Sequence, residues 1–180
     1  MIISSWNIRG LNQPHKQKEI NNLVATNKLD VLGIIESKVK NDNFPNIKSK
    51  ILNGWNYFSN RSVDASNRII MAWNSNIVLV TLSKVTKQLV HVSISDLYHA
   101  KNSEATFVYG RYTPIKRKLL WNDLSQLSYI YQYQPWMVTS DLNEVFCPQE
   151  ISGGNQDWNL GMEDMPECFN NAALVDLRYS

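Results

Sequence analysis

The sequence predicts a mixed α/β fold, and two kinds of pattern carry that prediction. Short apolar runs recur along the chain and have the length of buried strands. Longer segments instead repeat their apolar residues at the spacing of a helix. With 180 residues, of which 43% are hydrophobic and 19% charged, the composition is that of a globular protein. We therefore expect one domain that spans residues 1–180.

The apolar runs place the strands. The runs at 77–82 and 89–94 alternate in the way that is typical of an antiparallel pair. Residues 99–104 then predict a turn before the next strand. The predicted strands are residues 2–6, 31–35, 55–58, 69–73, 77–82, 89–94, 105–109 and 136–139, with a last one that begins at 174.

Three segments have helical spacing. Residues 14–27 repeat Ile20, Leu23 and Val24 on one face, and residues 162–171 predict a short helix. The clearest helix is 115–131, whose predicted inward stripe is Ile115, Leu119, Leu120, Leu124, Leu127 and Ile130. The short helix should turn Met162, Met165 and Phe169 inward.

Two polar stretches predict loops. Residues 38–50 are rich in Asn and Lys, and residues 148–161 contain Pro, Gly and Asn. The net charge of +2 is compatible with a polyanionic partner but is no evidence for one. We find no signal peptide and no apolar run of the roughly 20 residues that span a bilayer. We therefore expect an intracellular protein without a membrane partner, in which Cys147 and Cys168 are reduced, although a disulfide stays possible.

Polar side chains follow several of the predicted strands at their ends. Asn7, Glu36, Tyr109 and Asp141 each stand at or directly after an apolar run. Because strand ends meet at one edge of a sheet, we expect these groups to converge there. Their oxygens are hard ligands that suit Mg²⁺ or Mn²⁺. Taken singly, Asn7 is an ordinary turn residue and Glu36 an ordinary solvated carboxylate, so the joint pattern carries the hypothesis.

Five short motifs occur in a characteristic order. They are Ser-Trp-Asn-Ile-Arg-Gly-Leu-Asn at 5–12, Ile-Glu-Ser-Lys at 35–38, Val-Tyr-Gly at 108–110, Ser-Asp-Leu-Asn at 140–143 and Leu-Val-Asp at 174–176. Together they resemble the endonuclease/exonuclease/phosphatase superfamily, and the nearest likeness is the apurinic-type endonuclease domain of plant LINE-type (non-LTR) retrotransposons. Ser-Gly-Gly at 152–154 and Arg-Lys-Leu-Leu-Trp at 117–121 resemble that group as well. The resemblance implies a DNase I-like fold, a four-layer two-sheet β-sandwich flanked by helices.

The resemblance also implies roles for individual residues. By analogy, Asn7 and Glu36 bind the metal, which is Mg²⁺ or Mn²⁺. Asp141 acts as general base, while Asn143 and Tyr109 hold the phosphate. Arg9 and Asn12 approach the nucleic-acid backbone, and Asp176 is mostly architectural. The implied partner is DNA, the implied location of an active enzyme is the nucleus, and no obligate protein partner is evident.

Several departures from the family pattern bear on activity. Ser140 replaces a glycine, Leu142 replaces a phenylalanine, and the stretch 63–68 lacks the glycines usual before the next strand. We expect the fold to be incomplete at its C-terminus, without the family's final strands and closing Ser-Asp-His segment. The resemblance thus implies metal-dependent hydrolysis of DNA by a chain whose activity is impaired. The alternatives are a non-catalytic remnant of such a domain and, less favoured by the motifs, a phosphatase that acts on small molecules.

Overall fold

The computed structural model describes residues 1–144 and 163–176, and these residues form two compact units. The first unit comprises Met1–Tyr109 with Pro135–Asp141, and the second contains Gly110–Gln134 and the residues from Leu142 onward. The expectation of one domain stays a prediction.

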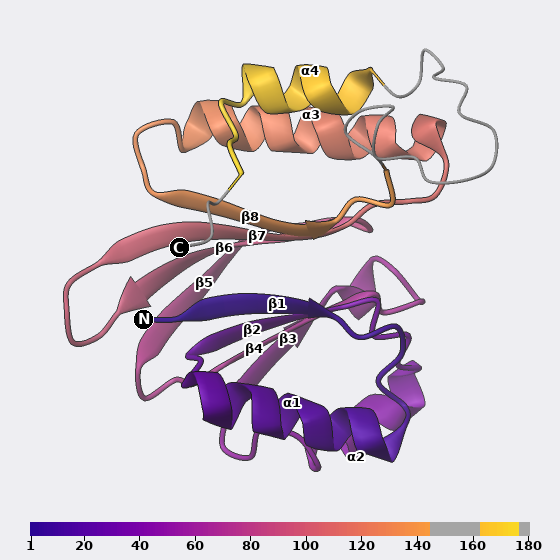
Figure 1. Cartoon of the computed structure of the whole chain (residues 1–180), viewed down its shortest axis with the longest axis vertical. Helices are drawn as coiled ribbons and strands as arrows, with labels where there is room; N and C mark the ends of the chain where they lie inside the picture. Colours follow the sequence, from indigo (N-terminus) through magenta and orange to yellow (C-terminus); the bar gives the residue numbers. More distant parts are fainter. Residues whose placement is uncertain (145–162, 177–180) are drawn as a thin grey trace. The chain divides into compact units, whose positions relative to one another are not determined.

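Two four-stranded sheets make up most of the first unit (Figure 1). In the first sheet, of order β1-β2-β4-β3, β1 and β2 are parallel and the other neighbours antiparallel. In the second, of order β5-β6-β7-β8, only β7 and β8 are parallel. The strands are β1 (Ile3–Asn7), β2 (Val31–Ile35), β3 (Asn56–Ser59), β4 (Ile69–Trp73), β5 (Val78–Val85), β6 (Leu89–Asp96), β7 (Asn102–Tyr109) and β8 (Trp136–Asp141).

The first sheet is buried on both faces. Helices α1 (Pro14–Asn27) and α2 (Phe44–Lys48) cover the face that is turned away from the second sheet (Figure 1). On β2, Leu32 and Ile34 pack toward these helices, and Val31 and Ile35 toward the second sheet. Successive side chains of β2 thus point alternately into two separate hydrophobic cores. Both faces of the strand are buried, which is why β2 is apolar at every position.

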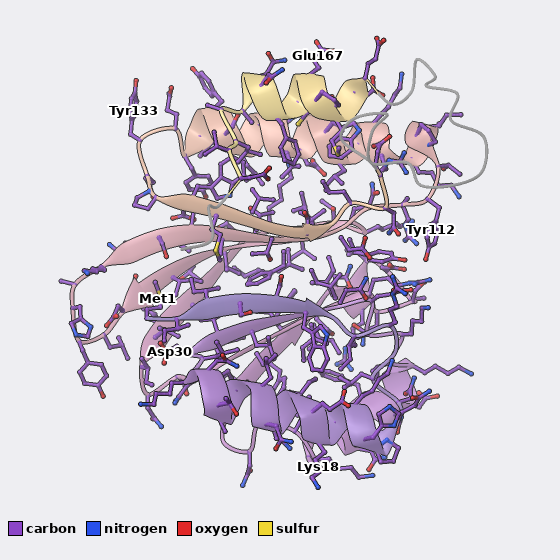
Figure 2. The ribbon with its side chains drawn as sticks, viewed as in Figure 1. Met1, Lys18, Asp30, Tyr112, Tyr133 and Glu167 are labelled. Atoms are coloured by element: carbon purple, nitrogen blue, oxygen red, sulfur yellow. The ribbon has the colours of Figure 1, made fainter. Side chains whose placement is uncertain are left out.

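The two sheets approach closely where β2 passes β7. A Cβ atom placed on Gly33 would lie 2.1 Å from the ring of Phe107. This is the close approach that a glycine inside a strand often marks. At the start of the strands, the Met1 amino group lies 3.8 Å from Asp30 and 3.3 Å from Asp96, so it links both sheets (Figure 2).

The second unit contains α3 (Pro114–Ile130) and α4 (Asp164–Asn171), which lie side by side (Figure 1). Its buried thiol, Cys168, accompanies Met165 on the inward face of α4. Within the described ranges 1–144 and 163–176, none of the helices has the length and apolar character to cross a membrane.

Most predicted elements are confirmed, and four details are wrong. Residues 38–50 are not a loop, because Asn41–Asn43 form a 3₁₀ turn and α2 follows with Phe44 and Ile47 buried. Residues 102–104 belong to β7 rather than to a turn. Residues 174–176 have no regular structure, so the predicted last strand is absent there.

The fourth correction concerns the inward stripe of α3. Ile115, Leu119 and Ile130 are 82%, 68% and 63% exposed. The buried face consists of Leu120, Leu124 and Leu127 with Trp121 and Arg117. Arg117 thus lies on the inward face of α3, and a search for apolar residues at helical spacing does not find a buried arginine. In α4, Met165 is buried as predicted and Phe169 is half-buried, whereas Met162 lies outside the described residues.

Candidate functional site

Parallel pairing brings four of the predicted side chains to strand ends of the first unit. Asn7 pairs with Ile35, so Glu36 follows directly beside it. Tyr109 pairs with Asp141 at the ends of β7 and β8. Asn7 donates a hydrogen bond from Nδ2 to Asp141 Oδ2, which joins the two sheets at this edge. The expected convergence of strand-end groups is therefore present for these residues.

Glu36 is buried, with 6% of its surface exposed. Its Oε1 lies 2.7 Å from Lys38 Nζ and 3.7 Å from Arg68 NH1. Desolvation raises the pKa of Glu36, but the hydrogen bond and charge of Lys38, the charge of Arg68 and a hydrogen bond from Asn7 together outweigh it. The pKa therefore lies below its ordinary value, and Glu36 is a buried anion at neutral pH.

Asn7 connects the two carboxylates of the site. Its amide group hydrogen-bonds to Glu36 as well as to Asp141. Its Oδ1 accepts a hydrogen bond of 3.1 Å from the backbone N–H of Arg9. The carboxamide is thus oriented from both of its ends, and it holds Glu36 and Asp141 beside one another.

The loops after β1 and β2 are tied together. Gly10 and Leu11 donate backbone hydrogen bonds of 2.8 Å to the carbonyl oxygens of Glu36 and Ser37. Asn12 Nδ2 donates to the Lys38 carbonyl at 3.0 Å. This contact gives Asn12 a structural part in the site, and its contact with nucleic acid stays a prediction.

Several residues of these loops have a left-handed backbone. Arg9, Glu36, Lys38 and Asn67 have φ values of 49°, 56°, 52° and 46°. Such torsions are uncommon for residues other than glycine and gather at functional sites, where surrounding contacts hold them. Here the holding contacts include the hydrogen bond from Asn67 Nδ2 to the Val39 carbonyl, at 3.1 Å.

Arg68 is a site residue that sequence reasoning missed. Its NH1 donates to Tyr109 Oη at 3.2 Å, and its guanidinium carbon lies 5.1 Å from the centre of the Tyr109 ring. Tyr109 is 1% exposed. The available signal was the stretch 63–68, which ends in Arg68 and lacks the glycines usual before the next strand.

Asn143 lies in the second unit. It has a φ of 50°, and its Nδ2 donates to the Gly110 carbonyl at 2.7 Å. Arg117 of α3 donates to the Arg111 and Asn143 carbonyls at 2.7 and 3.2 Å and pairs with Glu144 at 2.6 Å. A Cβ on Gly110 would lie 2.2 Å from the Leu142 carbonyl oxygen. Gly110 and Arg117 therefore shape the turn that presents Asn143.

The departure at Ser140 places no strain on the backbone. Ser140 lies within β8 and has none of the positive φ angles that favour glycine. The close approach in this region falls on Gly110 instead. Asp176 is exposed, and Ser-Gly-Gly at 152–154 lies outside the described residues.

The donor atoms of the first unit fit a hard divalent cation. Glu36, Asp141 and Asn7 offer oxygen atoms as metal ligands. The Lys38 ammonium lies 2.7 Å from Glu36 Oε1 and so occupies the position beside this carboxylate that a metal cation would take. The Lys38 side chain is 47% exposed, so its ammonium can move into solvent. Residues 1–144 and 163–176 contain no group of three or more His, Cys, Asp or Glu side chains that could together hold a metal ion. A cation held by one or two carboxylates and waters is the usual arrangement for Mg²⁺.

Comparison with known proteins gives matches only at the level of structure. No protein-family model and no curated protein matches the sequence. The endonuclease domain of TRAS1, a telomere-specific non-LTR retrotransposon, is similar with a TM-score of 0.70 and 12% identity, over 98% of this chain and 72% of that one. The AP endonuclease LMAP of Leishmania major is similar with a TM-score of 0.67 and 12% identity. The match covers 93% of this chain and 65% of that one.

A third structure is described as an endonuclease/exonuclease/phosphatase family protein from Bacteroides thetaiotaomicron. It has a TM-score of 0.60 and 12% identity, over 78% of this chain and 62% of its own. The chain has the fold of the endonuclease/exonuclease/phosphatase superfamily. The predicted fold class is therefore confirmed, and the chain spans about two thirds of the length of these superfamily domains.

Proposed function

We propose that this chain carries the metal-dependent phosphodiesterase chemistry of an endonuclease and that its substrate is DNA. The observation that carries the proposal is the bridge that Asn7 makes between Glu36 and Asp141 at the ends of β1, β2 and β8. The superfamily fold adds support, because two of the similar structures are named as endonucleases. At 12% identity these two structures support the fold alone, so the proposed substrate rests on the residues of the site.

In this proposal, Glu36 and Asn7 hold Mg²⁺ or Mn²⁺. A bound divalent cation would supply charge stabilisation to the phosphoryl group. Asp141 accepts a proton from the attacking water, and the Asn7 amide orients its carboxylate for that task. Tyr109 donates from its hydroxyl to a phosphoryl oxygen as negative charge develops. Asn143 donates to the phosphate from its amide, and Arg9 and Asn12 contact the nucleic-acid backbone.

Nicking of a supercoiled plasmid tests the proposal. The chain should nick with Mg²⁺ and lose this activity in EDTA. Asp141→Asn should lower the rate by roughly 10²–10⁴, the usual contribution of a general base. Asp42→Asn is the matched control, because Asp42 is exposed and lies on a separate 3₁₀ turn. Nicking that survives EDTA, or that Asp141→Asn leaves unchanged, would refute the proposal.

A non-catalytic remnant is the second candidate, and the histidines favour it. His91 contacts Thr106 and Glu104, and His99 contacts Asp96, so neither reaches the site residues in the described part of the chain. If the chain fails to nick, extension with a family C-terminal segment that carries Ser-Asp-His should restore activity. A phosphatase that acts on small molecules would instead hydrolyse a phosphate monoester faster than a diester.

A further inference from the structure

Arg68 stands beside the candidate site but belongs to none of the motifs. It immediately precedes β4, and the pairing of Ile35 with Ile69 places it next to Glu36 across the two strands. Its carbonyl oxygen accepts a hydrogen bond of 3.2 Å from the backbone N–H of Ser37. The backbone of Arg68 is therefore fixed, and the guanidinium is directed to Glu36 and Tyr109.

The guanidinium has more donors than partners. Its one hydrogen bond goes to Tyr109 Oη, and the 3.7 Å contact with Glu36 is too long for a hydrogen bond. Its Nε is buried and has no hydrogen-bond partner in the described structure. An arginine carries five N–H donors in a planar fork, and Tyr109 takes only one of them. The side chain is still 18% exposed, which leaves a path from solvent.

The charges around Arg68 favour an anion. Lys38 Nζ already lies 2.7 Å from Glu36 Oε1, so two cations share one carboxylate. The guanidinium lies against both the hydroxyl and the ring of Tyr109. A tetrahedral phosphate accepts hydrogen bonds from an arginine fork in the geometry that such a fork offers.

We propose that Arg68 is a phosphate-binding residue that donates to a non-bridging oxygen of the DNA backbone beside Tyr109. The inference rests on the proposed function, because it takes a phosphodiester as the ligand. It adds a residue that none of the five motifs contains. Arg68 also holds the Tyr109 hydroxyl in position for the same phosphate.

Binding of a fluorescein-labelled DNA duplex by the full chain, followed by anisotropy in EDTA, tests this role. Arg68→Gln should weaken binding roughly 10- to 100-fold, the usual effect of losing a charged hydrogen bond. It should also lower the slope of log K against log salt concentration by about one, because one phosphate contact is lost. Arg68→Lys should keep the salt slope and recover part of the affinity, since it keeps the charge without the fork.

Arg61→Gln is the matched control, because Arg61 is exposed and stacks over Phe44. Thermal unfolding of each variant shows whether it is folded. A folded Arg68→Gln variant with the wild-type affinity and salt slope would overturn the inference, even where plasmid nicking supports the proposed function. Binding that depends on Arg68 in a chain that does not nick would support the inference and refute only the catalysis. A wild-type chain that does not bind the duplex in EDTA would overturn the inference, whereas the proposed function is decided by plasmid nicking with Mg²⁺.

Discussion

Glu36 and Glu104 are both almost fully buried, with 6% and 4% of their surfaces exposed, yet their pKa values move in opposite directions. The pKa of Glu36 is lowered because Lys38, Arg68 and Asn7 outweigh its desolvation. The pKa of Glu104 is raised because desolvation outweighs the hydrogen bond from Ser93. Burial is the same in the two places, so the nearby cations make the difference.

Glu104 belongs to a polar cluster on the second sheet. His91, Ser93, Glu104 and Thr106 alternate with residues that pack against the first sheet, so they lie on its other face. Ser93 donates to Glu104 at 2.8 Å, and Trp136 Nε1 donates to Thr106 Oγ1 at 2.8 Å. His91 Nδ1 lies 2.8 Å from Thr106 Oγ1 and its Nε2 lies 3.2 Å from Glu104.

His91 does not form an ion pair with Glu104 at neutral pH, despite the short distance. Burial, with a smaller effect from the charge of Lys84, lowers the pKa of His91 to about 4. The imidazole is therefore neutral at pH 7, and the raised pKa of Glu104 shifts that carboxyl toward its uncharged form. The site at Glu36, in contrast, keeps a carboxylate charged in a buried position, which is what metal or phosphate chemistry requires.

Replacement of each glutamate by glutamine gives the largest contrast. Glu36→Gln removes the charge at the proposed metal site, and we expect plasmid nicking to fall by roughly 10²–10³. Glu104→Gln keeps the hydrogen-bonding capacity of its cluster, so the nicking rate should be unchanged. Rates measured at one Mg²⁺ concentration give the comparison. Equal losses in the two variants would show that the charged state of Glu36 has no special part in catalysis.

The second contrast appears in the pH dependence of stability. Because the pKa of His91 is about 4 when folded and near 6.5 when unfolded, the unfolded chain binds the extra proton. Stability is therefore lost as the pH falls below 6.5, by about 2 kcal/mol between pH 7 and pH 5. Glu104 acts with the opposite sign, because its raised pKa favours the folded state at low pH. Glu36 contributes only as the pH falls below its ordinary pKa of 4.5.

Urea unfolding of the wild type and of His91→Gln at pH 7 and pH 5 measures this effect. The variant should show a clearly smaller loss of unfolding free energy over that interval. His15→Gln is the matched control, because His15 is exposed on α1. The same loss in wild type and His91→Gln would mean that another group binds the proton.

The strand ends that carry the site could be predicted from the sequence. The positively charged side chains that surround Glu36 could not. Residues 31–35 are apolar throughout, so the limits of β2 and the place of Glu36 after it followed directly. The partnership with Arg68 depends on the antiparallel register of β2 and β4, which pairs Ile35 with Ile69. No local pattern contains that register. The left-handed φ of Glu36 and Lys38 is likewise imposed by contacts from distant loops.

Helix α2 and the inward face of α3 show the same limit. The polar residues at 38–50 concealed the spacing of Phe44 and Ile47, which become buried only because the first sheet and α1 lie beside them. On α3, Arg117 is buried because Glu144, 27 positions later, supplies its partner. The periodicity of apolar residues describes one segment at a time, so it does not predict contacts between residues this far apart in the sequence.

The smallest effect concerns Lys38, and it isolates the cause of the low pKa of Glu36. Lys38→Gln removes both a hydrogen bond and a charge from the carboxylate, so the pKa of Glu36 should rise. The unfolding free energy should change by less than about 1 kcal/mol, because the Lys38 side chain is 47% exposed and solvent screens its ion pair. Carboxyl-carbon NMR titration reports both glutamates at once, with exposed Lys40→Gln as control. An unchanged Glu36 pKa would leave Arg68 and Asn7 as the groups that keep this carboxylate charged. The difference between the two glutamates would then arise from the strand register alone.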